Sequence, residues 1–219
     1  MYKNINGSFL YFINYQDNER ELCKMEMRCL FNREINEKYF FSDIDINASK
    51  SPFIKSKIKI IYSDESLDRM VRKIKEDNLS YDDFKVSYVK SEQGDVQYED
   101  RLEATRKIGF VVNGYPDMHK PRNPLAVTKI NGLWIFGEYE RNDFKWQKHN
   151  DKPYSYSNEL GLRMARALVN IAMKDNEEGT LIDPCCGVGT VVIEALDLGI
   201  KVKGCEISKQ IAYNARENV

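Results

Sequence analysis

The sequence has no long apolar run. The only apolar run near its start is residues 9–13, which is too short for the core of a signal sequence or for a membrane span. Apolar residues make up 42% of the chain and charged residues 31%, a composition typical of soluble globular proteins. We therefore expect a cytoplasmic protein with no membrane partner.

Cysteine and histidine are scarce as well. The five cysteines are an odd number and show no paired Cys-x-x-Cys spacing, which excludes a disulfide framework and a zinc site of paired cysteines. The two histidines, His119 and His149, are far apart in the sequence and have no metal-ligand spacing. The sequence therefore predicts free thiols, no metal, and surface or hydrogen-bonded polar roles for both histidines.

The chain also lacks a strong charge of either sign. Its formal net charge of −1 neither indicates nor excludes a nucleic-acid partner. Residues 101–152 alone have a basic excess, with ten basic and six acidic side chains. Basic and aromatic residues are interleaved over 141–157, which could follow phosphates and stack on a base, although a solvated connection anchored by a buried Trp146 is the alternative. The candidates for RNA contact are Arg122, Lys129, Arg141, Lys145, Lys148 and Lys152.

Hydrophobic periodicity and turn residues predict the coarse order of elements. Strands are expected at 9–13, 38–46, 57–62, 84–89, 125–130 and 133–139, with a tight hairpin at Asn131-Gly132. Helices are expected at about 18–31, from Ser63 or Asp64 to 77, at 98–112 with a left-handed stop at Asn113-Gly114, from a Ser157 cap to 174, and at 208–219. In the helix before residue 174, the polar face that carries Arg163, Arg166 and Asn170 is expected to be solvated, and the stripe of Leu160, Met164, Leu168, Ile171 and Ala172 to be apolar.

The most informative stretch is residues 180–195. It reads as a short apolar strand that ends in an acid, a tight turn (Asp183-Pro-Cys-Cys-Gly187-Val-Gly189-Thr190) and an amphipathic helix. A doubly wound sheet presents a nucleoside-like ligand at the carboxyl end of its first strand in this way, because glycine lets the backbone approach the ligand closely. The alternative is an α/β domain in which the glycines only make a turn.

A second strand follows and is itself followed by an acid. Glu206 lies 19 positions after Gly187, the distance at which a carboxylate meets the ribose hydroxyls of a bound nucleoside. The third glycine of a dinucleotide site is replaced by Val192, and the Gly-Lys-Ser/Thr of a phosphate-binding loop is absent. These two absences argue against a dinucleotide and against a nucleoside triphosphate.

The loop resembles the first motif of class I S-adenosylmethionine-dependent methyltransferases. Its Asp-Pro-x-Cys-Gly-x-Gly-Thr, followed by Ile-Glu-Ala, is similar to the variant found in RNA and DNA amino-group methyltransferases. In that group the loop backbone wraps the methionine part of the cofactor, and the acid after the second strand holds the ribose. The resemblance implies S-adenosyl-L-methionine as the cofactor. Carried over by position, the cofactor-binding residues are Tyr156, Asp183, Pro184, Cys185, Cys186, Gly187, Gly189, Thr190, Glu206 and Ile207.

Together with the loop, Lys152-Pro-Tyr-Ser-Tyr-Ser157 and the helix after it resemble THUMP-domain RNA methyltransferases, a group that includes enzymes acting on the 2-amino group of guanosine in tRNA. The stretch from Phe84 to Gly137 is more loosely similar to a THUMP domain. The implied fold class is α/β with an α+β N-terminal half. Its expected parts are a ferredoxin-like region at 1–62, a THUMP-like RNA-binding domain at 63–140, a linker at 141–157, and the first part of a Rossmann-like methyltransferase sheet at 158–219.

The resemblance implies an enzyme that methylates the exocyclic amine of a guanosine in tRNA or another structured RNA, while the THUMP-like half grips the acceptor end. Separately from the resemblance, we expect a monomer. Two alternatives stay open: an adenine amino methyltransferase acting on DNA or ribosomal RNA, and an RNA-binding remnant without catalytic strands. The family's catalytic Asp/Asn-Pro-Pro-aromatic signature is absent, so no catalytic residue is assigned. Because only two of the family's seven strands are present, we expect Val219 to be a cut in a longer protein.

Overall fold

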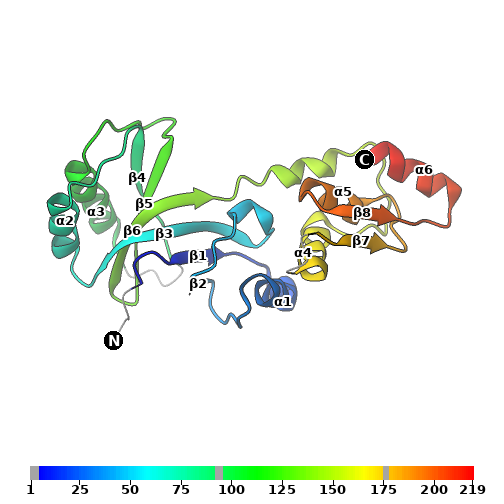
Figure 1. The fold of residues 1–219 in the computed structure, drawn as a ribbon, viewed down its shortest axis with the longest axis horizontal. Helices are drawn as coiled ribbons and strands as arrows, with labels where there is room; N and C mark the ends of the chain where they lie inside the picture. Colours follow the sequence, from blue (N-terminus) through cyan, green and yellow to red (C-terminus); the bar gives the residue numbers. More distant parts are fainter. Residues whose placement is uncertain (1–4, 92–95, 175–177) are drawn as a thin grey trace. The chain divides into compact units, whose positions relative to one another are not determined.

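A computed structural model describes residues 5–91, 96–174 and 178–219. It shows a mixed α/β chain that divides into two compact units (Figure 1). The first, here called the sheet unit, comprises residues 1–13, 37–45 and 56–141. The second, here called the loop unit, comprises residues 14–36, 46–55 and 142–219.

The sheet unit is built around one mixed sheet with the strand order β2-β1-β3-β6-β5-β4. The β1–β2, β3–β6 and β5–β6 pairs are antiparallel, and β4 runs parallel to β5. The strands are β1 (Phe9–Ile13), β2 (Tyr39–Ser42), β3 (Ile54–Asp64), β4 (Phe84–Tyr88), β5 (Asn123–Ile130) and β6 (Leu133–Arg141).

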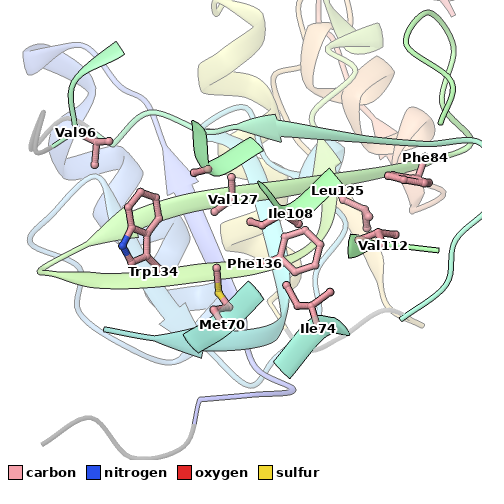
Figure 2. Packing of buried hydrophobic residues seen from close by; sticks show 11 residues of the cluster. Met70, Ile74, Phe84, Val96, Ile108, Val112, Leu125, Val127, Trp134 and Phe136 are labelled. Carbon is pink, nitrogen blue, oxygen red and sulfur yellow. The ribbon is translucent and has the colours of Figure 1, made fainter. Parts of the chain in front are cut away.

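Both faces of this sheet carry apolar side chains. Successive side chains of a strand point to opposite faces, so the apolar runs of β5 and β6 supply both. Helices α2 (Leu67–Glu76) and α3 (Tyr98–Val111) cover one face, where Met70, Ile108 and Phe136 belong to a single buried cluster (Figure 2). Val127 and Phe136 of the sheet belong to this first cluster, whereas Ala126 and Ile135, which precede them on β5 and β6, belong to a second cluster. The alternation therefore gives the sheet unit two separate layers of core.

The predicted hairpin is confirmed. Asn131 and Gly132 join β5 to β6 with φ values of 49° and 82°, the left-handed pair that a two-residue hairpin turn needs. Farther along β6, Gly137 pairs with Ile60 next to an irregularity in the β3–β6 register. A Cβ at Gly137 would lie 1.9 Å from the backbone oxygen of Lys59, so the two strands approach too closely there for any side chain.

The loop unit contains a parallel two-stranded sheet and four α-helices among its described residues. The helix α1 packs on α4, and α4 packs on α5, with a small apolar cluster around Val169, Ala195 and Ile200. The elements are η1 (Asp17–Glu19), α1 (Arg20–Phe31), η2 (Ala48–Lys50), η3 (Lys145–Asp151), α4 (Leu162–Met173), β7 (Thr180–Asp183), α5 (Thr190–Asp197), β8 (Lys201–Gly204) and α6 (Lys209–Asn218), where η denotes a 3-10 helix.

The predicted elements are present, but two helix starts are wrong. Helix α2 is capped by Ser66, whose hydroxyl accepts from a backbone amide in the first turn, and not by Ser63 or Asp64. Helix α4 begins after Gly161, several residues beyond the predicted cap at Ser157. In both cases a polar residue lay upstream of the true start, and capping propensity alone does not distinguish between such positions.

The end of α3 differs as well. Its C-cap, Val112, has an extended backbone, so Asn113-Gly114 is not a left-handed stop of the helix. Asn113 instead pairs with Ser80 in an isolated bridge, and its amide donates to the carbonyl of Leu79. Tertiary pairing, rather than a glycine cap, ends this helix.

Each of the two units combines segments that lie far apart in the sequence. Residues 9–13 and 39–42 pair in the same sheet as 123–141, whereas 20–31 lie in the loop unit. The expected linker, 141–157, contains the 3-10 helix η3 and the buried Trp146. The sheet is thus shared by both parts of the N-terminal half, and the segment after it is folded.

Candidate functional site

The turn between β7 and α5 forms the centre of the site. The carboxylate of Asp183 at the end of β7 accepts a hydrogen bond from the amide of Cys185 at 3.1 Å, which closes the first part of the turn. Gly187 has a φ of 54°, and a Cβ at this position would meet nothing within 4 Å. The backbone at Gly187 is therefore left-handed and faces open space, the arrangement that lets a ligand approach the main chain.

Strand β8 holds the turn from the other side. The amide of Cys205 donates to the carbonyl of Asp183 at 2.8 Å, and the amide of Cys186 donates to the carbonyl of Cys205 at 2.9 Å. These bonds extend the β7–β8 pairing beyond the strand ends and place Glu206 beside the turn.

The carboxylate of Glu206 binds the turn directly. Its Oε2 accepts from the amide of Gly187 at 3.1 Å, and its Oε1 accepts from the amide of Ser208 at 2.8 Å. A carboxylate offers about four lone-pair sites, so two further donors can be accepted. The acid that follows the second strand therefore lies beside the glycine turn.

A cavity of about 550 Å³ opens next to the turn. Its lining includes most of the predicted cofactor residues, namely Tyr156, Asp183, Pro184, Cys185, Cys186, Gly187 and Thr190. Gly189, Glu206 and Ile207 are not part of the lining, and Ile207 is 99% exposed. The sequence missed the wall formed by α4, to which Leu168, Ile171 and Ala172 contribute. The helical spacing of these residues is the sequence signal that could have identified this wall. The predicted apolar stripe lines the cavity rather than a closed core.

Two polar groups in the lining have distinctive environments. The hydroxyl of Thr190 is buried, and within the described ranges it has no hydrogen-bond partner. Burial, followed by the nearby carboxylates of Asp183 and Glu206, raises the pKa of the Cys186 thiol above its ordinary value. Cys186 is therefore a neutral, poorly nucleophilic thiol, and all five cysteines are free, as predicted.

A buried charged cluster lies behind the turn. Arg166 and Asn170 are 4% and 2% exposed, so the expectation of a solvated polar face on α4 is wrong for these two residues. Arg166 donates from Nη1 to Glu194 at 2.7 Å and to Asp197 at 2.9 Å. His149 lies 2.6 Å from the other oxygen of Glu194, so its predicted polar role is confirmed. Tertiary partners, not solvent, satisfy this face.

The structure corrects one candidate for RNA contact. The side chain of Lys152 is only 5% exposed and pairs with Glu159 at 3.0 Å, so it is not available to a phosphate. Arg122 pairs with Asp83, and Lys145 pairs with Asp143 at 2.8 Å. The five candidates with exposed or half-buried side chains are Arg122, Lys129, Arg141, Lys145 and Lys148.

Two features are absent from the described residues, 5–91, 96–174 and 178–219. In these ranges no helix combines the length and the apolar character that a membrane crossing requires. Over the same residues, no three His, Cys, Asp or Glu side chains are grouped so that they could hold a metal ion.

Several known proteins that are similar to this chain are named as methyltransferases. The family model N6_N4_Mtase, described as DNA methylase, matches residues 1–217. The chain is 27% identical over 108 residues to the tRNA (guanine(10)-N2)-dimethyltransferase of Methanothermobacter thermautotrophicus, a match that covers 47% of this chain and 32% of that protein. It is 31% identical over 106 residues to the enzyme of the same name from Pyrococcus abyssi, with 47% and 31% covered.

The matched part of the chain thus spans about a third of the length of these relatives. Among solved structures, TrmN from Thermus thermophilus is similar with 15% identity and a TM-score of 0.47. That match covers 96% of this chain and 69% of the other.

Proposed function

We propose a function from one premise: the chain belongs to the N6_N4_Mtase family, the DNA methylases. Its loop unit binds S-adenosyl-L-methionine at the turn between β7 and α5. The observation that carries this proposal is the open, left-handed Gly187 next to the carboxylate of Glu206. When bound, this cofactor supplies an electrophilic methyl group for transfer to an exocyclic amine.

The residues present fit such a ligand. A Cβ at Gly187 would occupy the space that the cofactor needs, and none is there. Glu206 keeps acceptor capacity for the two ribose hydroxyls, and the exposed Ile207 offers an apolar surface to the adenine. Tyr156, which lines the cavity, packs beside the methionine end. The raised pKa of the Cys186 thiol keeps this side chain from competing with the acceptor amine for the methyl group.

We further propose that the acceptor is the 2-amino group of a guanosine in tRNA. The support is that both relatives described above are named for this reaction on guanine 10. In this proposal the THUMP-like region expected at 63–140 grips the acceptor end, and it follows the ferredoxin-like region expected at 1–62. Arg122, Lys129, Arg141, Lys145 and Lys148 are the proposed phosphate contacts.

A chain that binds this cofactor through Glu206 will lose affinity when the carboxylate is removed. Replacing Glu206 with alanine is expected to weaken S-adenosylmethionine binding by about 1–3 kcal/mol, because two ribose hydroxyls lose their acceptors. Isothermal titration calorimetry measures this change. Glu217→Ala, which removes an exposed acid on α6, serves as the matched control and should bind normally. Equal affinity of the Glu206 variant and the unchanged protein would refute the ribose contact.

The family description favours a second candidate, an adenine amino methyltransferase on DNA or ribosomal RNA. A gel-shift titration with the whole chain separates the two. Binding to tRNA should be tighter than to duplex DNA with the same number of phosphates, and its affinity should fall as salt is raised, because bound cations are released from the phosphates. Preference for the duplex would favour the second candidate, and affinity that ignores salt would contradict a phosphate-led interface.

A further inference from the structure

Glu194 is a fully buried carboxylate on α5, the helix that follows the cofactor turn. One of its oxygens accepts from Arg166 Nη1 at 2.7 Å, and the other lies 2.6 Å from His149 Nδ1. A carboxylate removed from water needs charged or polar partners for both oxygens. The position of Glu194 is therefore defined by two side chains from different elements.

Arg166 cannot follow Glu194 if the helix moves. Its Nε donates to the carbonyl of Lys50 at 3.2 Å, and its Nη2 donates to the carbonyl of Ser49 at 2.9 Å. The remaining charged group is Asp197, which accepts from Arg166 at 2.9 Å and lies 3.6 Å from His149 Nε2. The guanidinium is thus fixed to η2, and α5 is held against it.

His149 supplies the second fixed point. It lies on η3, whose Trp146 is buried and whose indole nitrogen has no hydrogen-bond partner within the described part of the chain. The side chain of His149 is only 10% exposed, which restricts it to one orientation. In the described contacts, the polar connection between η3 and α5 therefore runs through His149, which lies 2.6 Å from Glu194 and 3.6 Å from Asp197.

Helix geometry carries this fixation to the cofactor turn. Glu194 follows Thr190 by four residues, so both lie on the same face of α5, and both are buried. Gly189, the N-cap with a φ of 89°, accepts from the amide of Ile193. Any rotation of Glu194 would therefore rotate the first turn of α5 and the left-handed residues before it.

We propose that His149 is a positioning residue for the cofactor turn and that it acts through Glu194. His149 contacts neither the cavity lining nor the turn. It fixes the rotation of α5 about the helix axis, and therefore also the position of the backbone amides that precede Val191. This inference rests on the proposed function only for the identity of the ligand. The positioning of the turn by His149 is expected in the chain without ligand as well.

A matched pair of variants tests the role. His149→Asn keeps a donor near the place of Nδ1, which faces Glu194, whereas His149→Gln keeps one near the place of Nε2, which faces Asp197. Both are polar and of similar size. We expect amide hydrogen exchange at Gly189 and Ile193, whose amides donate to the carbonyls of Cys186 and Gly189, to be about tenfold faster in the Gln variant and close to the unchanged rate in the Asn variant. Binding of S-adenosylmethionine should weaken about tenfold in the Gln variant alone.

Glu19→Gln, which breaks the Arg163–Glu19 pair elsewhere in the loop unit, is the control and should leave both readouts unchanged. Equal exchange rates in the Asn and Gln variants would overturn the positioning role, even if cofactor binds. If the unchanged chain binds no S-adenosylmethionine but the exchange rates follow the expected order, the positioning role stands and the proposed function fails.

Discussion

Replacing Arg166 with methionine is expected to lower the free energy of unfolding by about 3–5 kcal/mol, because it leaves a buried carboxylate without its main partner. Among the described contacts, Glu194 would keep its pair with His149, and the carbonyl of Ser49 would lose its donor, whereas the carbonyl of Lys50 would keep Asn170. Methionine nearly matches the length of arginine, so the loss of packing is small. Urea denaturation followed by circular dichroism measures the change.

The same helix provides the control. Arg163 pairs with Glu19 at 2.8 Å, but its side chain is 34% exposed. Solvent screens such a pair, so Arg163→Met should cost about 1 kcal/mol or less. Changing Glu194 to glutamine in the Arg166→Met background should recover part of the loss, since a neutral amide is less costly to bury than a charge. If the two methionine variants were equally stable, the buried cluster would contribute nothing beyond a surface pair.

A second large effect concerns pH. Glu26 on α1 is fully buried, and burial raises the pKa of its carboxyl from 4.5 to about 7. Hydrogen bonds from Ser51 Oγ and Asn170 Nδ2, each 2.6 Å long, oppose this rise without cancelling it. The folded state thus holds a proton that the unfolded chain has already released.

The sign of the effect follows from this difference. Between pH 4.5 and 7 the folded protein binds more protons than the unfolded chain, so the stability present below pH 4.5 is lost as pH rises through 7. The expected loss is about 3 kcal/mol over this window. Urea midpoints measured across it give the slope directly.

Glu26→Gln should flatten that slope, because a neutral amide does not titrate. Glu21→Gln on the same helix, where the side chain is 82% exposed, should leave the slope unchanged. A slope that persists in the Glu26 variant would mean that other groups dominate the pH dependence of stability.

The cofactor turn was accessible from the sequence because local chemistry determines it. An acid at the end of an apolar strand, glycines at left-handed positions and an acid 19 residues after Gly187 specify a turn without reference to the rest of the chain. The hairpin at Asn131-Gly132 follows from the same kind of signal.

Other features depend on contacts between distant segments, and no local pattern reports them. Arg166 is buried only because residues 49 and 50 supply carbonyls to it, and these precede it by more than 100 positions. Helix α1 packs on α4, so its predicted place in a separate N-terminal region does not match the compact units. A polar helix face that the sequence predicts to be solvent-exposed can thus be buried between several elements.

The segments of the two units alternate along the sequence, which limits where the protein can be truncated. Residues 14–36 and 46–55 belong with 142–219, yet they are interleaved with segments of the other unit. Shortening the protein at residue 141 would strand Glu26 in an apolar environment without Asn170, its partner from α4. No single cut separates the two units, so an isolated loop unit would have to keep α1 and α4 together.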